Sequence, residues 1–239
     1  MVSTYQLIVE MLGAVAAGAT ILVCLRKGLF SRYLILNTYL LGTLAFILGC
    51  FYVRSVYQYD SPHYFYFYFT GDASLSVVSY LLVGSFFDQM LRNSLFHRYI
   101  RPVLGLIVLV VIAVTGLFIS RNVDYLYGRF VVELQQNMYF VGVLLTFLLR
   151  IAMSYLQDFS RRFVLLVSGI GVLYGAHAAT YALVLLGGKR VEFATSIIPL
   201  AYTLMVFLWL YTFVRVPEGE PMAAPARVRP RESVVEARL

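Results

Sequence analysis

The chain has 239 residues, of which 61% are hydrophobic and only 13% are charged, and its mean hydropathy is +0.80. Soluble domains carry about 25% charged residues, so this composition excludes an ordinary water-soluble domain and leaves no room for a separate soluble catalytic one. The formal net charge is +7, and the basic residues lie between apolar runs, where they orient helices and meet anionic headgroups. We therefore expect the lipid bilayer as a partner and no nucleic acid.

Seven segments are long and apolar enough to cross a bilayer, which takes about 20 mainly apolar residues. In chain order they cover residues 4–25, 33–57, 64–91, 102–120, 129–153, 162–186 and 192–215. The first segment lacks the basic residues that begin a cleaved signal peptide, so we expect it to be retained. The sequence therefore predicts an all-α integral membrane protein whose residues 1–216 form a seven-transmembrane helix bundle.

The segments between these runs predict the orientation of the bundle. One side carries 14 of the 19 Lys and Arg residues, and each of its segments is richer in them than any segment on the other side. Basic side chains collect on the cytoplasmic side of membrane proteins. We expect the N-terminus outside and the C-terminus in the cytoplasm, in a cytoplasmic membrane that is either a plasma membrane or a bacterial inner membrane.

The last residues of the chain differ from the rest. Residues 217–239 contain four prolines, several alanines and charges of both signs. This composition cannot bury a hydrophobic core, so we predict a disordered or extended cytoplasmic tail.

Small residues recur four apart in two of the predicted helices. They are Gly13 and Ala17 in the first helix, and Gly171 and Gly175 in the sixth. Because helices in lipid associate where small side chains allow close approach, we expect contact faces there. The pattern is common in membrane bundles and indicates little about function.

Six consecutive aromatic residues, Tyr64 to Phe69, begin the third predicted helix at its outer end. Aromatic belts lie at the level of the lipid headgroups, so one interpretation is an interfacial anchor. Six residues in a row point all around a helix, so some of the rings must face the bundle. The other interpretation is therefore a stacking wall for an aromatic or lipid-like ligand.

Ionisable residues within membrane-spanning helices are costly and indicate functional sites by default. Glu10, Asp72, Glu133 and His177 all fall in the predicted outer half of the membrane, on four different helices. Arg54 lies at the outer end of the second helix. This shared depth predicts one polar region near the outer surface.

Helical spacing groups further polar residues with these positions. Three stripes each share a helix face: Glu133, Gln136 and Asn137; Tyr174, His177 and Tyr181; and Asp72, Ser76 and Ser79. Tyr202 lies near Pro199, which can free a backbone carbonyl. If the stripes face inward, they form a polar cavity open to the outside. The candidate ligand-binding residues are Glu10, Arg54, Asp72, Glu133, Gln136, Asn137, Tyr174, His177, Tyr181 and Tyr202.

Two other interpretations of these residues stay open. Arg54 could pair with Asp72 or Glu133, and His177 could be a hydrogen-bonded core histidine, which would make an inert hydrogen-bond network. A proton or ion path is the other, although the inner half shows no matching series of acidic groups.

Sequence motifs for chemistry are absent. A retinal protein needs a lysine in its last helix, and the nearest one, Lys189, precedes that helix. The sequence contains no Gly-x-Ser-x-Gly, His-Glu-x-x-His, Cys-x-x-Cys or phosphate-binding loop. The three histidines fall in different regions and cannot bind one metal, so we predict no metal site and identify no cofactor.

The leading hypothesis is a non-enzymatic membrane protein with a polar, outward-facing intramembrane site, acting as a small-ligand sensor or binding protein. An alternative is an accessory or structural subunit of a larger membrane complex, with other membrane subunits or copies of itself as partners. A further alternative is a small transporter or a lipid-handling membrane enzyme.

Overall fold

The computed structural model describes residues 4–58, 61–92, 97–119, 126–156, 160–187 and 194–217. Within these ranges the protein is helical, and seven helices are long and apolar enough to cross a membrane. The predicted helix count is therefore confirmed. The predicted tail, apart from Pro217, lies outside the described residues.

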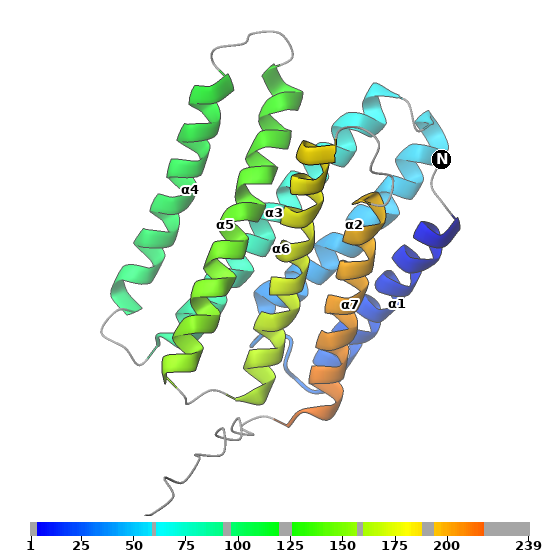
Figure 1. Ribbon diagram of the computed structural model, residues 1–239. Helices are drawn as coiled ribbons and strands as arrows, with labels where there is room; N and C mark the ends of the chain where they lie inside the picture. The colour runs from blue at the N-terminus through cyan, green and yellow to red at the C-terminus, as the bar shows by residue number, and fades with distance from the viewer. Residues whose placement is uncertain are drawn as a thin grey trace, which may run out of the picture.

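Successive helices run in opposite directions, as Figure 1 shows. Their bounds are α1 (Thr4–Arg26), α2 (Leu34–Tyr57), α3 (Pro62–Met90), α4 (His97–Ile119), α5 (Leu126–Leu156), α6 (Arg161–Gly187) and α7 (Ala194–Arg215). We call the end of the bundle where α1 begins the N-terminal side, and the opposite end, where α7 finishes, the C-terminal side.

Several helices extend beyond the predicted ranges, which were set by apolar character. The clearest case is α4, which begins at His97 and contains Pro102. The first four amide groups of a helix have no partner within it, so a proline at the sixth position removes only one later hydrogen bond. A helix continues into polar flanks because its backbone hydrogen bonds do not depend on apolar side chains.

Six of the seven helices form a closed ring. The neighbours around it are α1, α2, α3, α5, α6 and α7, with α7 returning to α1. Helix α4 lies outside this ring and, in the described residues, packs only on α5 and α3 (Figure 1). The interior of the bundle is thus bounded by six helices.

The contact between α1 and α7 uses the small residues of α1. A side chain at Gly13 would approach Thr203 Oγ1 to 2.8 Å, and Ala17 is completely buried. The Thr203 hydroxyl also donates a hydrogen bond to the Val9 carbonyl at 3.0 Å. The predicted α1 face is therefore a close contact, whereas a side chain at Gly175 of α6 would meet nothing within 4 Å.

Large side chains fill the interior towards the C-terminal side. Trp209 is completely buried, and its indole Nε1 donates to the Leu166 carbonyl at 3.0 Å. This approach requires Gly169, where an added Cβ would lie 2.5 Å from that nitrogen. The Tyr33 and Phe213 rings meet edge to face, with centroids 5.1 Å apart. This half of the bundle is a packed apolar core.

Cations hold the end of α7 on the C-terminal side. Gly28, with a φ of +65°, ends α1 in the left-handed conformation that favours glycine. The preceding Lys27 donates its Nζ to the Phe213 carbonyl at 2.7 Å. Arg162, only 4% exposed, donates its Nε to the Val216 carbonyl at 3.1 Å. Both cations suit the negative end of the helix dipole.

Candidate functional site

A cavity of about 860 Å³ lies inside the ring and is lined by side chains from all six ring helices. It extends from Arg54 and Ser61 at the N-terminal side down to Tyr39 and Ser79. Its volume is within the range of about 300–1,000 Å³ that is usual for small-molecule sites. The cavity is therefore large enough to enclose a small organic molecule.

Six of the ten residues predicted to bind a ligand line this cavity. They come from α1, α2, α3, α6 and α7, and are Glu10, Arg54, Asp72, His177, Tyr181 and Tyr202. The remaining four, which the structure places elsewhere, are Glu133, Gln136, Asn137 and Tyr174. Residues far apart in the sequence thus meet at one cavity, while ligand binding itself stays a prediction.

Asp72 is the centre of a hydrogen-bonded group on the cavity wall. Gln135 donates its Nε2 to Asp72 Oδ2, and the Tyr139 hydroxyl donates to Asp72 Oδ1 at 3.3 Å. An ionised carboxylate only accepts hydrogen bonds, so two donors suit it. These bonds join α3 to α5. Asp72 is thus held by neutral groups of α5 instead of Arg54, the partner that the sequence suggested.

His177 is stacked on Tyr139. Their ring centroids are 3.7 Å apart and their planes differ by 11°. The histidine is 5% exposed, and its Nδ1 has no hydrogen-bond partner among the described residues. Tyr181 lies beside the pair, with its centroid 6.3 Å from that of Tyr139. The stack fixes the imidazole while leaving one of its nitrogens unpaired.

Unpaired polar atoms gather at this cavity. In the described part of the chain, four buried side-chain atoms lack a hydrogen-bond partner, and three belong to lining residues: Gln135 Oε1, His177 Nδ1 and Tyr202 Oη. The residues Gln135, His177 and Tyr202 are 2%, 5% and 9% exposed. Buried polar groups in proteins are normally paired, and an unpaired one costs about 1–3 kcal/mol. Three residues that line the cavity therefore carry a buried polar atom without a hydrogen-bond partner.

The inward face of α5 differs from the one expected. Gln135 and Tyr139 face Asp72, whereas Asn137 donates its Nδ2 to Thr115 Oγ1 of α4 at 3.0 Å. Residues 133 and 135–137 of α5 are all polar, so polarity alone could not select the face. The sequence does hold one signal that could have selected the face. The stripe through Gln135 and Tyr139 continues to small residues, whereas the stripe through residues 133, 136 and 137 continues to the large apolar Phe140 and Leu144. In the structure these two residues are 40% and 63% exposed.

Tyr174 lies beneath the cavity floor and does not line it. Its hydroxyl donates to Ser79 Oγ at 2.9 Å, and Ser79 is a lining residue. Its ring packs against Gly142, where an added Cβ would collide with it. It also meets Tyr139 edge to face, with centroids 6.0 Å apart. Tyr174 therefore positions Ser79 and Tyr139 from below.

The aromatic run of α3 contributes both to the cavity and to the surface. Ser61 caps the helix by accepting from the Tyr64 amide at 3.1 Å, which sets where the rings begin. Four rings of the run line the cavity, namely Tyr64, Phe65, Tyr68 and Phe69. Tyr66 is 53% exposed. One face of the run is thus an aromatic wall, as one of the two interpretations requires.

Charged groups and one thiol complete the lining. Among the described residues that line the cavity, Glu10 and Asp72 are acidic, and Arg54 is the one Lys or Arg. Arg54 interacts electrostatically with Glu10. Glu10 and Asp72 both interact electrostatically with the Cys50 thiol, which also lines the cavity. Cys24 is a second free cysteine, but it is completely buried near the C-terminal side.

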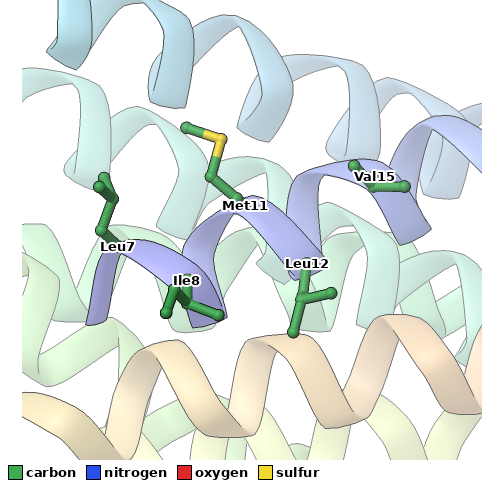
Figure 2. A pocket seen from close by; sticks show the side chains of 5 residues that line it. All are labelled: Leu7, Ile8, Met11, Leu12 and Val15. Atoms are coloured by element: carbon green, nitrogen blue, oxygen red, sulfur yellow. The ribbon is translucent and has the colours of Figure 1, made fainter. Parts of the chain in front are cut away.

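A second hollow, of about 280 Å³, lies along the surface of α1. Figure 2 shows the five side chains that line it. It is lined by Leu7, Ile8, Met11, Leu12 and Val15, which are between 37% and 71% exposed. Among the described side chains, no charged group and no nitrogen or oxygen faces it, so it suits lipid chains. Leu7 also lines the large cavity, which brings the cavity close to this apolar surface.

The described residues contain no group of three His, Cys, Asp or Glu that could hold a metal ion. The chemistry that the cavity offers is instead hydrogen bonding, negative charge and aromatic surface. Comparison with protein-family models, curated proteins and solved structures finds no match to this chain.

Proposed function

We propose that this chain is a non-enzymatic multi-pass protein of a cytoplasmic membrane, acting as a sensor or binding protein for a small ligand in the large cavity. The supporting observation is the set of unpaired atoms on His177, Gln135 and Tyr202 at the cavity wall. A bundle built only for packing would pair such groups internally. A ligand with hydrogen-bonding groups supplies their partners, which favours a binding site over an inert network.

The cavity faces the outside in this proposal. The C-terminal side carries the basic segments of the sequence, with Lys27 and Arg162 among the described residues there. By the positive-inside rule this side is cytoplasmic, so the N-terminus and the cavity end near Ser61 are external. A ligand would then arrive from the outer solution or from the outer leaflet.

The packing of the cytoplasmic half favours binding over transport. Five large side chains there are at most 1% exposed: Leu82, Phe86, Leu166, Trp209 and Phe213. A carrier needs a path to the second side of the membrane, and these side chains fill the space below the cavity. The transporter alternative therefore requires a second conformation with this core opened.

The accessory-subunit alternative is favoured by one observation. Helix α4 lies outside the ring, and Leu106 and Leu109 on it are 60% and 63% exposed. Mass measurement after mild solubilisation separates the two functions. A stable complex with another protein would support a subunit role, whereas a partner-free monomer would support the binding protein.

Native mass spectrometry of the full chain released in lipid discs tests ligand binding. We expect a small molecule bound to the wild-type protein and lost in His177→Leu, because the leucine removes the unpaired nitrogen and keeps side-chain volume. Asp88→Asn is the matched control, since Asp88 pairs with Arg101 far from the cavity. A folded His177→Leu protein that retains every bound mass of the wild type would refute the proposal.

A further inference from the structure

We infer that the ligand of this cavity is a small organic monocation, in which an ammonium group is joined to an apolar body. This inference rests on the proposed function, because it specifies what that binding site recognises. Three features of the lining carry it: the balance of charge, the kind of unpaired atom, and the aromatic surface.

Among the described residues, the lining has one more acidic group than basic groups. Arg54 acts electrostatically on Glu10, whereas the two donors to Asp72 are neutral side chains of α5. A carboxylate held away from bulk water is costly unless a positive charge compensates it. A monocation near Asp72 and Glu10 supplies the missing charge, while an anion would increase the imbalance.

The unpaired atoms of the lining residues suit a ligand that donates hydrogen bonds. Gln135 Oε1 can only accept a hydrogen bond, since its Nε2 is already used on Asp72. His177 Nδ1 and the Tyr202 hydroxyl oxygen can also accept. An ammonium group has donors and no acceptors, so it suits unpaired acceptors of this kind, whereas an ionised carboxylate could not pair with Gln135 Oε1.

The aromatic surface suits an organic cation with an apolar part. Ten of the 26 described residues that line the cavity are Tyr or Phe. Aromatic faces attract cations within about 6 Å and also pack against apolar groups. A bare metal ion is not favoured, because the described residues provide no cluster of three ligating side chains.

The reactivity of Cys50 towards charged reagents tests the charge of the ligand. Cys50 lines the same cavity, and its thiol interacts electrostatically with Glu10 and Asp72. The full chain in lipid discs is treated with three methanethiosulfonates that carry a trimethylammonium, an uncharged methyl or a sulfonate group. Modification of Cys50 is followed by peptide mass mapping, with glutathione as the reference thiol.

The measured quantity is the rate of Cys50 modification by the cationic reagent divided by the rate with the anionic reagent. We expect this ratio to be about tenfold or more larger than the same ratio for glutathione. Asp72→Asn should remove most of this preference, and Asp88→Asn should leave it unchanged. Glu10→Gln serves as a second variant if Asp72→Asn does not fold, and it should also lower the ratio.

The possible failures are distinguishable. Equal rates for the three reagents, or a faster anion, overturn the cationic ligand while leaving the binding cavity in place. No reaction of Cys50 with any reagent in the folded protein contradicts the open cavity, and with it both proposals. A cation preference that persists in both Asp72→Asn and Glu10→Gln overturns the assignment of the charge to these carboxylates.

Protection of Cys50 from the cationic reagent by added amines tests whether the ligand has an apolar part. We expect 2-phenylethylammonium to slow modification about tenfold more than ethylammonium at the same concentration, because only the former fills the aromatic part of the cavity. Equal protection, or none by either amine, overturns this part of the inference. With the uncharged methyl reagent, whose local concentration does not depend on the surface charge of the disc, slower modification in phosphatidylethanolamine than in phosphatidylglycerol would identify a lipid headgroup as the source of the ammonium. Equal rates with this reagent would identify a soluble amine.

Discussion

Replacing Gly142 by alanine should disturb the floor of the cavity. The added Cβ would collide with the Tyr174 ring, with two of the ring carbons at 2.6 Å. Ordinary carbon contacts are about 3.5–4.0 Å, so the ring must move by about 1 Å. Tyr174 is 1% exposed and its hydroxyl is bonded to Ser79, so the movement strains the core and weakens that hydrogen bond. Overpacking and a weakened bond together should cost about 2–4 kcal/mol.

Reversible unfolding by SDS or urea in mixed micelles measures this loss as a change in the free energy of unfolding. Gly175→Ala is the matched control, because it lies in a neighbouring helix and its added Cβ meets nothing within 4 Å. We expect the control to stay within about 1 kcal/mol of the wild type, on the stabilising side. The double variant Gly142→Ala with Tyr174→Leu should lose less than the sum of the single losses, because the collision is gone. A Gly142→Ala protein as stable as Gly175→Ala would refute this account of the floor.

Four further outcomes are expected. Arg162→Met should lower the free energy of unfolding by about 1.5–3 kcal/mol in the same assay, because a buried charged donor at the end of α7 is lost; an unchanged value would contradict the helix-end contact. Arg101→Ala should change the free energy of unfolding by less than about 1 kcal/mol, because the Arg101 side chain, which pairs with Asp88, is 78% exposed. Tyr139→Phe should cost about 0.5–1.5 kcal/mol, because it removes one donor to Asp72 while keeping the ring; a neutral result would count against that bond. The emission of Trp209, the one tryptophan of the chain, should resist quenching by aqueous iodide in the folded protein, since the side chain is completely buried.

The helix count could be predicted from the sequence, because crossing a membrane imposes a local requirement of length and apolarity on each segment. The arrangement of the helices could not. That α4 lies outside the ring while α3 packs on α5 depends on the shapes of many contacting surfaces. Composition gives little sign of it, since the lipid-facing and bundle-facing sides of a membrane helix are both apolar.

The depth of the site was also within reach of the sequence. The sequence places Glu10, Asp72, Glu133 and His177 at similar depth, because each lies a known number of helical residues from the outer end of its helix. Three of the four line one cavity, and Glu133 does not. Rotation about the helix axis was harder to predict. On α5 the inward residues are Gln135 and Tyr139, which only the contacts with α3 and α6 reveal.

The role of each aromatic residue depended on packing as well. The run from residue 64 to residue 69 satisfies the pattern of a headgroup belt and of a ligand wall equally. Phe67 stacks on Phe46 at 6.1 Å, while its neighbour Tyr68 lines the cavity. Adjacent residues of one type thus serve different surfaces, a distinction that only the three-dimensional arrangement makes.

A density map of the protein purified in native lipid discs, without added ligand, tests the binding cavity most directly. We predict non-protein density inside the six-helix ring, within hydrogen-bonding distance of His177 Nδ1 and beside Asp72. A map in which the α3 rings have collapsed into this space, with His177 Nδ1 and Gln135 Oε1 paired to protein groups, would contradict the account.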